Sequence, residues 1–178
     1  MKKALVLFAV LVFAGVSNIS AQTVYPNGEE QLAELNLLQL ISEASVGDIK
    51  KFRVSKVLGS EGINRDGVKI AFLGDNFKKI TNGRVEPKVR AAKLAVYRLE
   101  RFATARDIAS AIPAKKRVTT FGQIYQLVKA QANGEAGPLH VNGWANFFLC
   151  YGNDGNLWLV RALLFGASGG WSFRAHPL

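Results

Sequence analysis

Apolar and polar positions alternate most clearly near the end of the chain, where the pattern predicts three consecutive β-strands. Residues 144–151, 157–165 and 171–176 are rich in aromatic and β-branched side chains, which favour strands. The Asp154-Gly155 pair after the first segment supplies the positive φ that a tight hairpin turn needs. Residues 166–170, with three glycines, provide the second turn. The pattern therefore predicts an antiparallel β-meander of at least three strands.

The last two of these segments differ in how their apolar side chains are placed. Segment 171–176 alternates, with Trp171, Phe173 and Ala175 on one side, which is typical of a strand with one covered face. Segment 157–165 is apolar on both sides except at Arg161. This favours a central strand that is covered on both faces.

Two capping boxes mark the starts of helices in the middle of the chain. Thr104 is followed three residues later by Asp107, and Thr120 by Gln123. In such pairs the side chains satisfy backbone N–H groups that the first helical turn leaves free. The boxes predict a helix over 104–112, ended by Pro113, and a second helix over about 120–131.

The first half of the chain is less regular. Leucines recur near helical spacing after the acidic pair Glu29-Glu30 and predict a helix over about 29–44. Residues 50–58 and 68–73 are plausible strands on either side of a glycine-rich loop. Residues 91–100 fit a strand or part of one long helix, and the capping box at Thr104 favours the strand. The fold class is thus α+β: an N-terminal helix, a central mixed region with two short helices, and a C-terminal meander packed against them.

The apolar run at the start of the chain has the pattern of a secretory signal peptide. Lys2 and Lys3 precede about 13 apolar residues, and small and polar residues follow up to Ala21. A transmembrane anchor is the alternative, but a spanning helix needs ~20 apolar residues. We therefore expect export to remove residues 1–21 and to place the protein in the periplasm or outside the cell, with no membrane span. Residues 22–47 form an acidic linker and helix, and residues 48–178 a single basic domain.

The net charge of +10 is concentrated in the middle of the chain. Residues 48–132 carry 19 Lys and Arg against seven Asp and Glu, whereas residues 22–47 carry four acids and no base. A basic segment of this kind attracts polyanions such as nucleic acid, acidic glycan or an anionic lipid surface. A solvated basic face that serves solubility alone is the alternative. The predicted polyanion-binding residues are Arg98, Arg101, Arg106, Lys115, Lys116 and Arg117.

Motifs for catalysis, for metal ions and for cofactors are missing from the sequence. The two histidines, His140 and His176, stand in no metal-ligand spacing, and no glycine-rich phosphate loop is present. The single cysteine, Cys150, excludes an intramolecular disulfide and lies in an apolar run, which favours a buried structural thiol over a nucleophile. Among the aromatic residues, Trp158 is the best candidate for an exposed stacking contact because it follows the hairpin turn.

These observations favour a non-enzymatic binding or interaction module, with no catalytic residue, metal or cofactor assigned. A hydrolase whose site is assembled from distant residues, Asp75, His140 and Arg161, is the first alternative. The second is a structural envelope subunit that pairs through an exposed edge strand at residues 171–176.

Several short motifs together resemble an uncharacterised family of bacterial hypothetical proteins from metagenomic genomes. They are Phe72-Leu73-Gly74 with Asn76-Phe77, Thr119-Thr120 with Tyr125 and Leu127, Gln131-Ala132-Asn133-Gly134-Glu135, Asn142-Gly143-Trp144-Ala145-Asn146-Phe147, Gly155 with Leu157, and Gly170-Trp171. The resemblance covers roughly residues 70–178. It implies a domain in this part of the chain and carries no activity.

Overall fold

The computed structural model describes residues 10–14, 37–64 and 66–178. The strands are β1 (Val10–Ala14), β2 (Leu38–Val46), β3 (Phe52–Arg53), β4 (Gly62–Ile63), β5 (Lys69–Leu73), β6 (Val85–Glu86), β7 (Ala92–Leu99), β8 (Asn146–Tyr151), β9 (Leu157–Leu164) and β10 (Trp171–Pro177). The helices are α1 (Ser55–Leu58), α2 (Asp75–Thr81), α3 (Ala105–Ala111), the 3₁₀ turn η1 (Ala114–Lys116), α4 (Phe121–Ala130) and α5 (Gly166–Gly169).

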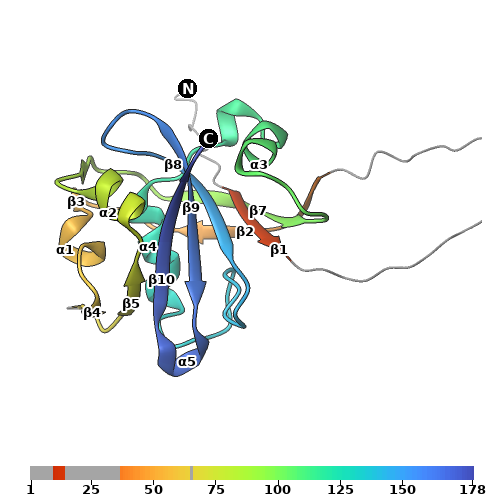
Figure 1. Ribbon diagram of the computed structural model, residues 1–178. Helices are drawn as coiled ribbons and strands as arrows, with labels where there is room; N and C mark the ends of the chain where they lie inside the picture. The colour runs from red at the N-terminus through yellow and green to blue at the C-terminus, as the bar shows by residue number, and fades with distance from the viewer. Residues whose placement is uncertain (1–9, 15–36, 65) are drawn as a thin grey trace, which may run out of the picture.

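Most strands form one mixed sheet with the order β2-β7-β1-β8-β9-β10-β5-β4. Strands β8, β9 and β10 run antiparallel in sequence order, whereas β10 pairs with β5 in parallel. Strand β1 lies between β7 and β8, parallel to the first and antiparallel to the second. Figure 1 shows the long strands β9 and β10 crossing the middle of the molecule.

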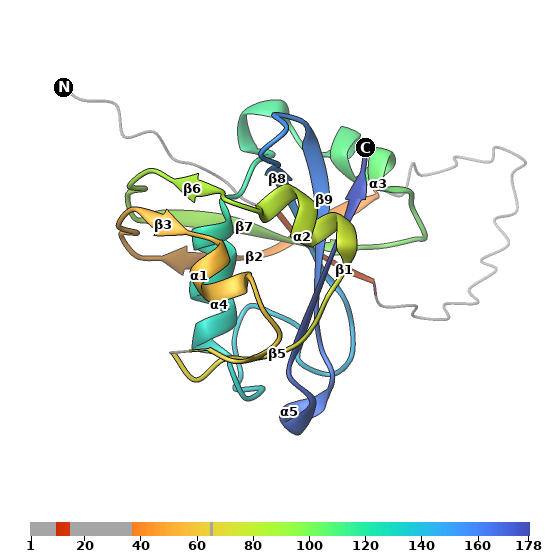
Figure 2. The same ribbon diagram turned by 60° about the vertical axis from the view of Figure 1, so that its left-hand side comes forward.

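The two faces of the sheet bury different clusters of side chains. On one face, which we call the α4 face, Phe148, Val160 and Phe173 pack with the apolar residues of α2 and α4; α4 lies behind β9 and β10 in Figure 1. On the opposite face, the α3 face, Leu149 and Leu159 pack against Ile108 and Ile112 of α3 and its end. The C-terminus lies beside α3 in both views (Figures 1 and 2).

The predicted meander and its two supporting helices are confirmed. The turn between β8 and β9 contains Gly155 with φ +76°, a conformation that a residue with a Cβ rarely adopts. At both predicted capping boxes the threonine side chain accepts a hydrogen bond from the third helical residue, and that residue's side chain accepts one from the threonine N–H. Residues 92–99 form strand β7, so the strand interpretation of this segment is correct and the long helix is wrong.

The helix predicted over residues 29–44 is wrong in the part that the structure describes. Leu38–Val46 is a strand that pairs antiparallel with β7 along its length, and residues 29–36 lie outside the described residues. Only Ala44 and Val46 of this strand are buried. A helix is stabilised mainly by packing an apolar stripe, so leucines at helical spacing are not sufficient to form one. Here the backbone hydrogen bonds with β7 favour the strand.

Two further segments differ from the sequence predictions. Residues 50–58 hold only the two-residue strand β3, followed by helix α1. Helix α2 was not predicted at all; its Phe77 stacks on Phe173 at 5.2 Å between ring centroids. A seven-residue segment is too short to show a clear helical period. Packing against the sheet stabilises this helix instead.

The last long strand is an edge over only part of its length. Trp171–Phe173 of β10 pair with β5 on one side and β9 on the other, so the edge expected at residues 171–176 is covered in this half. Arg174–His176 pair with β9 and have no strand partner on the other side among the described residues. None of the helices in the described parts of the chain has both the length and the apolar character needed to cross a lipid bilayer.

Candidate functional site

Two arginines stand directly opposite each other on neighbouring strands of the α3 face. Arg161 of β9 and Arg174 of β10 are register partners, and His176 is the next outward residue of β10. Side chains alternate between faces along a strand, so Arg161 shares its face with Leu159, which packs under α3. We call Arg161, Arg174 and His176 the arginine cluster. Among the described residues, neither guanidinium forms an ion pair with a carboxylate.

The charges of the cluster act on one another. Burial lowers the pKa of Arg161 below its usual value, and the Arg174 charge lowers it further; an arginine nevertheless stays protonated in proteins. Burial also lowers the pKa of His176, with smaller contributions from both arginines. The cluster therefore carries two positive charges, and burial and these charges favour the neutral form of the imidazole beside them.

The surroundings of Arg174 hold its side chain over an apolar support. Its guanidinium lies over the Phe72 ring, 5.1 Å from the centroid, and a Cβ placed on Gly74 would come within 3.3 Å of its Cγ. The turn after β5 is tied to β10, because Gly74 N–H donates to the Phe173 carbonyl and the Asn76 amide donates to that of Ala175. Phe72 is 39 % exposed, so cation and ring both border solvent.

The predicted basic residues around α3 form a second group of cations. Arg101, Arg106 and Lys115 are exposed, and Lys116 is half-buried. Hydrogen bonds from Thr104 lower the pKa of Asp107, and the charges of Arg101 and Arg106 lower it further. Arg106 lies on α3, which packs on the sheet face from which Arg161 projects, and Arg101 and Lys115 lie in the chain just before and just after this helix. We call these three residues the α3 cations.

The structure separates the other two predicted binding residues from this group. Arg98 follows Tyr97, which packs in the α3 cluster, so Arg98 projects from the opposite face; it donates to Gln39 and, at 2.7 Å, to Glu100. Arg117 donates twice to the carbonyl of Ile112, at 3.1 and 2.9 Å. That carbonyl lies at the end of α3, where cations stabilise free carbonyl groups, so Arg117 has a structural role.

Two expectations about single side chains have opposite outcomes. Trp158 is only 8 % exposed and its indole N–H donates to the Asp154 carboxylate, so it offers no stacking surface. It shares the α4 face with Val160, and a strand residue there is covered. Cys150 is buried as predicted, and burial raises the pKa of its thiol well above the usual value, which makes it unreactive.

The three residues of the hydrolase alternative come from separate elements. Asp75 is exposed at the start of α2, and Arg161 projects from the α3 face. His140 lies in the loop before β8, where its backbone N–H donates to the side-chain oxygen of Asn146. No ion pair joins Asp75 to Arg161 in the described residues. The hydrolase stays a prediction without a supporting contact.

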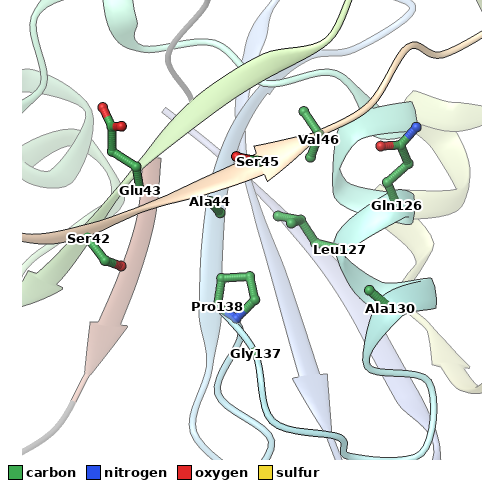
Figure 3. Close-up of a pocket in the computed structure, with 10 residues that line it drawn as sticks. All are labelled: Ser42, Glu43, Ala44, Ser45, Val46, Gln126, Leu127, Ala130, Gly137 and Pro138. Carbon is green, nitrogen blue, oxygen red and sulfur yellow. The ribbon is translucent and has the colours of Figure 1, made fainter.

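An open hollow of about 540 Å³ lies on the other side of the molecule, between β2, α4 and the loop before β8. Figure 3 shows its lining, with Leu127 and Pro138 at the centre. Two of its polar side chains have partners elsewhere: the Gln126 amide bonds with Gly47, and Glu43 pairs with Lys93 at 3.3 Å. The other polar side chains of its described lining are the hydroxyls of Ser42 and Ser45, so this lining has no charged group free to fix a ligand.

Across the described residues, no group of three or more His, Cys, Asp and Glu side chains is placed to hold a metal ion. Comparisons with protein-family models, with curated proteins and with solved structures find no match for this chain. The resemblance to a family of bacterial hypothetical proteins thus stays a prediction, and the site must be interpreted from its own geometry.

Sequence analysis missed the arginine cluster although its signals were present. Arg161 is the one charged residue in an otherwise apolar strand, and Arg174 and His176 occupy the polar side of the alternating strand after it. Only the hairpin register shows that the two arginines are direct partners.

Proposed function

We propose that the protein is an exported, non-enzymatic binding module whose basic surface engages a polyanionic partner. The observation that carries the proposal is the pair Arg161–Arg174, two cross-strand cations without an acidic partner in the described part of the chain. Like charges directly opposite on a sheet are destabilising. A bound phosphate, sulfate or carboxylate group offsets that cost and satisfies the planar N–H donors of both guanidinium groups.

The α3 cations extend this interaction on and beside the helix that packs on this sheet face. Arg101, Arg106 and Lys115 are exposed, and an extended polyanion presents charged groups at regular intervals, so it can contact the cluster and these cations together. A single small anion contacts only one of the two groups. The arrangement thus favours a polymer or a charged surface over an isolated ion, and the long-range attraction falls as salt screens it.

Binding to heparin, to duplex DNA and to anionic vesicles, each at about 20 mM and about 150 mM NaCl, tests the proposal. The double variant Arg161→Gln/Arg174→Gln is compared with Lys88→Gln/Arg90→Gln, which removes the same charge from exposed positions elsewhere. We expect the first to weaken binding about tenfold and the second at most about twofold. For duplex DNA, the plot of log K against log salt has a negative slope, and its magnitude decreases by about 2 when two phosphate contacts are lost.

The ranking of the three ligands identifies the class of partner. Equal losses for both double variants would show that net charge alone drives binding, and binding that disappears at the higher salt in the wild type would make the basic surface a solubility feature. Either result would remove the proposal. Circular dichroism of each variant confirms that the fold is retained.

A further inference from the structure

The middle of the main sheet contains a strand from the predicted signal peptide, residues 1–21, which we also call the leader. Val10–Ala14 forms β1, and its five residues pair in parallel with Ala95–Leu99 of β7. On its other side, Val12 and Phe13 pair antiparallel with Phe147 and Asn146 of β8. Cleavage after Ala21 would remove this strand from the centre of the sheet, not from an edge.

Loss of β1 leaves a gap of one strand. Neighbouring strands lie about 4.8 Å apart, so β7 and β8 are separated by about twice that distance. Both are held in place by other partners: β7 pairs with β2 over most of its length, and β8 pairs with β9. Leu94 and Val96 of β7 are buried in the cluster on the α4 face, and Leu149 of β8 in the cluster on the α3 face.

The gap has the chemistry to accept an extended apolar segment. Its two sides are backbone edges whose N–H and C=O groups lack partners once β1 is gone, and such edges recruit a further strand. With β1 in place, Ala95, Val96 and Leu99 are each at most 5 % exposed. A charged strand would be desolvated there without compensation, so the segment must be uncharged.

We infer that the mature protein has a strand-acceptor slot between β7 and β8 that binds an extended, apolar, uncharged peptide segment of a partner polypeptide by strand addition. The segment runs parallel to β7 and antiparallel to β8, over about five residues, as the chain's own Val10–Ala14 does. Before cleavage the leader fills the slot, and removal of the leader opens it. This inference uses the predicted cleavage and is independent of the arginine cluster.

A peptide binding experiment on the exported protein tests the slot. The protein is purified from the export compartment of an expressing bacterium, and its intact mass shows whether residues 1–21 are gone. A probe peptide, Val-Leu-Val-Phe-Ala flanked by lysines, is then titrated against it. A probe with proline at the central position is the control, because proline removes a backbone donor. The full-length chain, whose slot is filled, is the matched protein control.

Support consists of three results together. The exported protein lacks the leader, it binds the probe at least about tenfold more tightly than the proline control, and the full-length chain does not bind. Hydrogen exchange then shows new protection at the slot-facing amides of Ala95–Leu99 and Asn146–Phe147, those not already bonded to β2 or β9, with no change at the far strand β5. If the exported chain is unfolded, restoration of its circular dichroism by the probe also supports the slot.

Four results would overturn the inference. The exported protein retains the signal peptide. The folded mature protein does not bind the probe, or an unfolded mature protein is not rescued by it. The amides of Ala95–Leu99 that face away from β2 are already protected without the probe, because a second copy or another part of the same chain closes the gap.

Discussion

In the arginine cluster, two cations without an acidic partner among the described residues lie next to the titrating side chain of His176. Each arginine could have been paired with a carboxylate on the neighbouring strand, and such pairs stabilise sheets. Instead the described residues place a second cation opposite the first and an imidazole beside both. The imidazole reports on this arrangement, because any change in the two positive charges alters its pKa.

The titration of His176 is the prediction at this scale. We expect its pKa to lie below the usual value of about 6.5, because burial and the two arginines disfavour the imidazolium ion. In Arg161→Gln/Arg174→Gln the pKa rises towards the usual value, since the smaller causes of the shift are removed. NMR titration of the imidazole protons measures both, and His140→Gln assigns the signals. An unchanged pKa in the double variant contradicts the geometry of the cluster.

The same shift sets the sign of two pH effects. The pKa of His176 is lower in the folded protein than in the unfolded chain, so the unfolded chain binds the proton more readily. The folded state is therefore destabilised as pH falls below the pKa of the unfolded chain. The loss ends once pH is below the folded-state pKa. An anion bound at the proposed site would raise the pKa of His176. We therefore expect anion binding to take up a proton and to become tighter as pH falls through this range.

At the scale of elements, helix α4 depends on a charged residue from a distant strand. The buried Glu86 of β6 accepts hydrogen bonds from the N–H groups of Phe121 and Gly122, at 3.0 and 2.8 Å. These are two of the donors that the first turn of a helix leaves free, and the negative charge lies at the positive end of the helix. Arg84 lies 3.6 Å from the same carboxylate and over the Phe121 ring.

Replacing Glu86 tests this role. Glu86→Gln keeps the size but offers one carbonyl oxygen in place of two carboxylate oxygens, so one N–H group loses its acceptor. We expect the free energy of unfolding to fall by about 1–3 kcal/mol, measured by urea denaturation. Glu100→Gln, at an exposed ion pair with Arg98, serves as the control and changes stability by less than about 0.5 kcal/mol. Equal effects of the two substitutions would show that Glu86 is not a helix cap.

The elements that could be predicted from the sequence are those with local signals. Turn glycines and capping boxes act within a few residues, so the meander, α3 and α4 were found. Strand β2 and helix α2 arise from contacts with partners far along the chain, β7 and β10, and no local pattern contains that information. The arginine cluster is missed for the same reason, because a cross-strand register joins residues that the sequence shows only as isolated cations.

At the scale of the whole molecule, charge is distributed unequally in sequence and in space. The chain carries a net charge of +10, and the ion pairs among the described residues are mostly exposed, where each contributes little. We therefore expect mutual repulsion of the excess cations to outweigh these pairs. The folded state bears this cost, which a polyanionic partner would remove.

The response of thermal stability to salt follows from this imbalance. We expect the melting temperature to rise when NaCl is raised from about 10 mM to about 150 mM, because screening weakens the repulsion. A gain of about 1 kcal/mol corresponds to roughly 2–4 °C for a domain of this size. Differential scanning calorimetry at neutral pH measures it. A melting temperature that falls with salt would show that the ion pairs dominate.

The buried thiol of Cys150 has a consequence for the protein under oxidising conditions. As the only cysteine, it has no partner within its own chain, and any disulfide it forms joins two molecules. In the folded state the thiol is shielded within β8, so such cross-linking requires the sheet to open first. The fraction of covalent dimer that forms under oxidising conditions would therefore measure how often, and for how long, the sheet has opened.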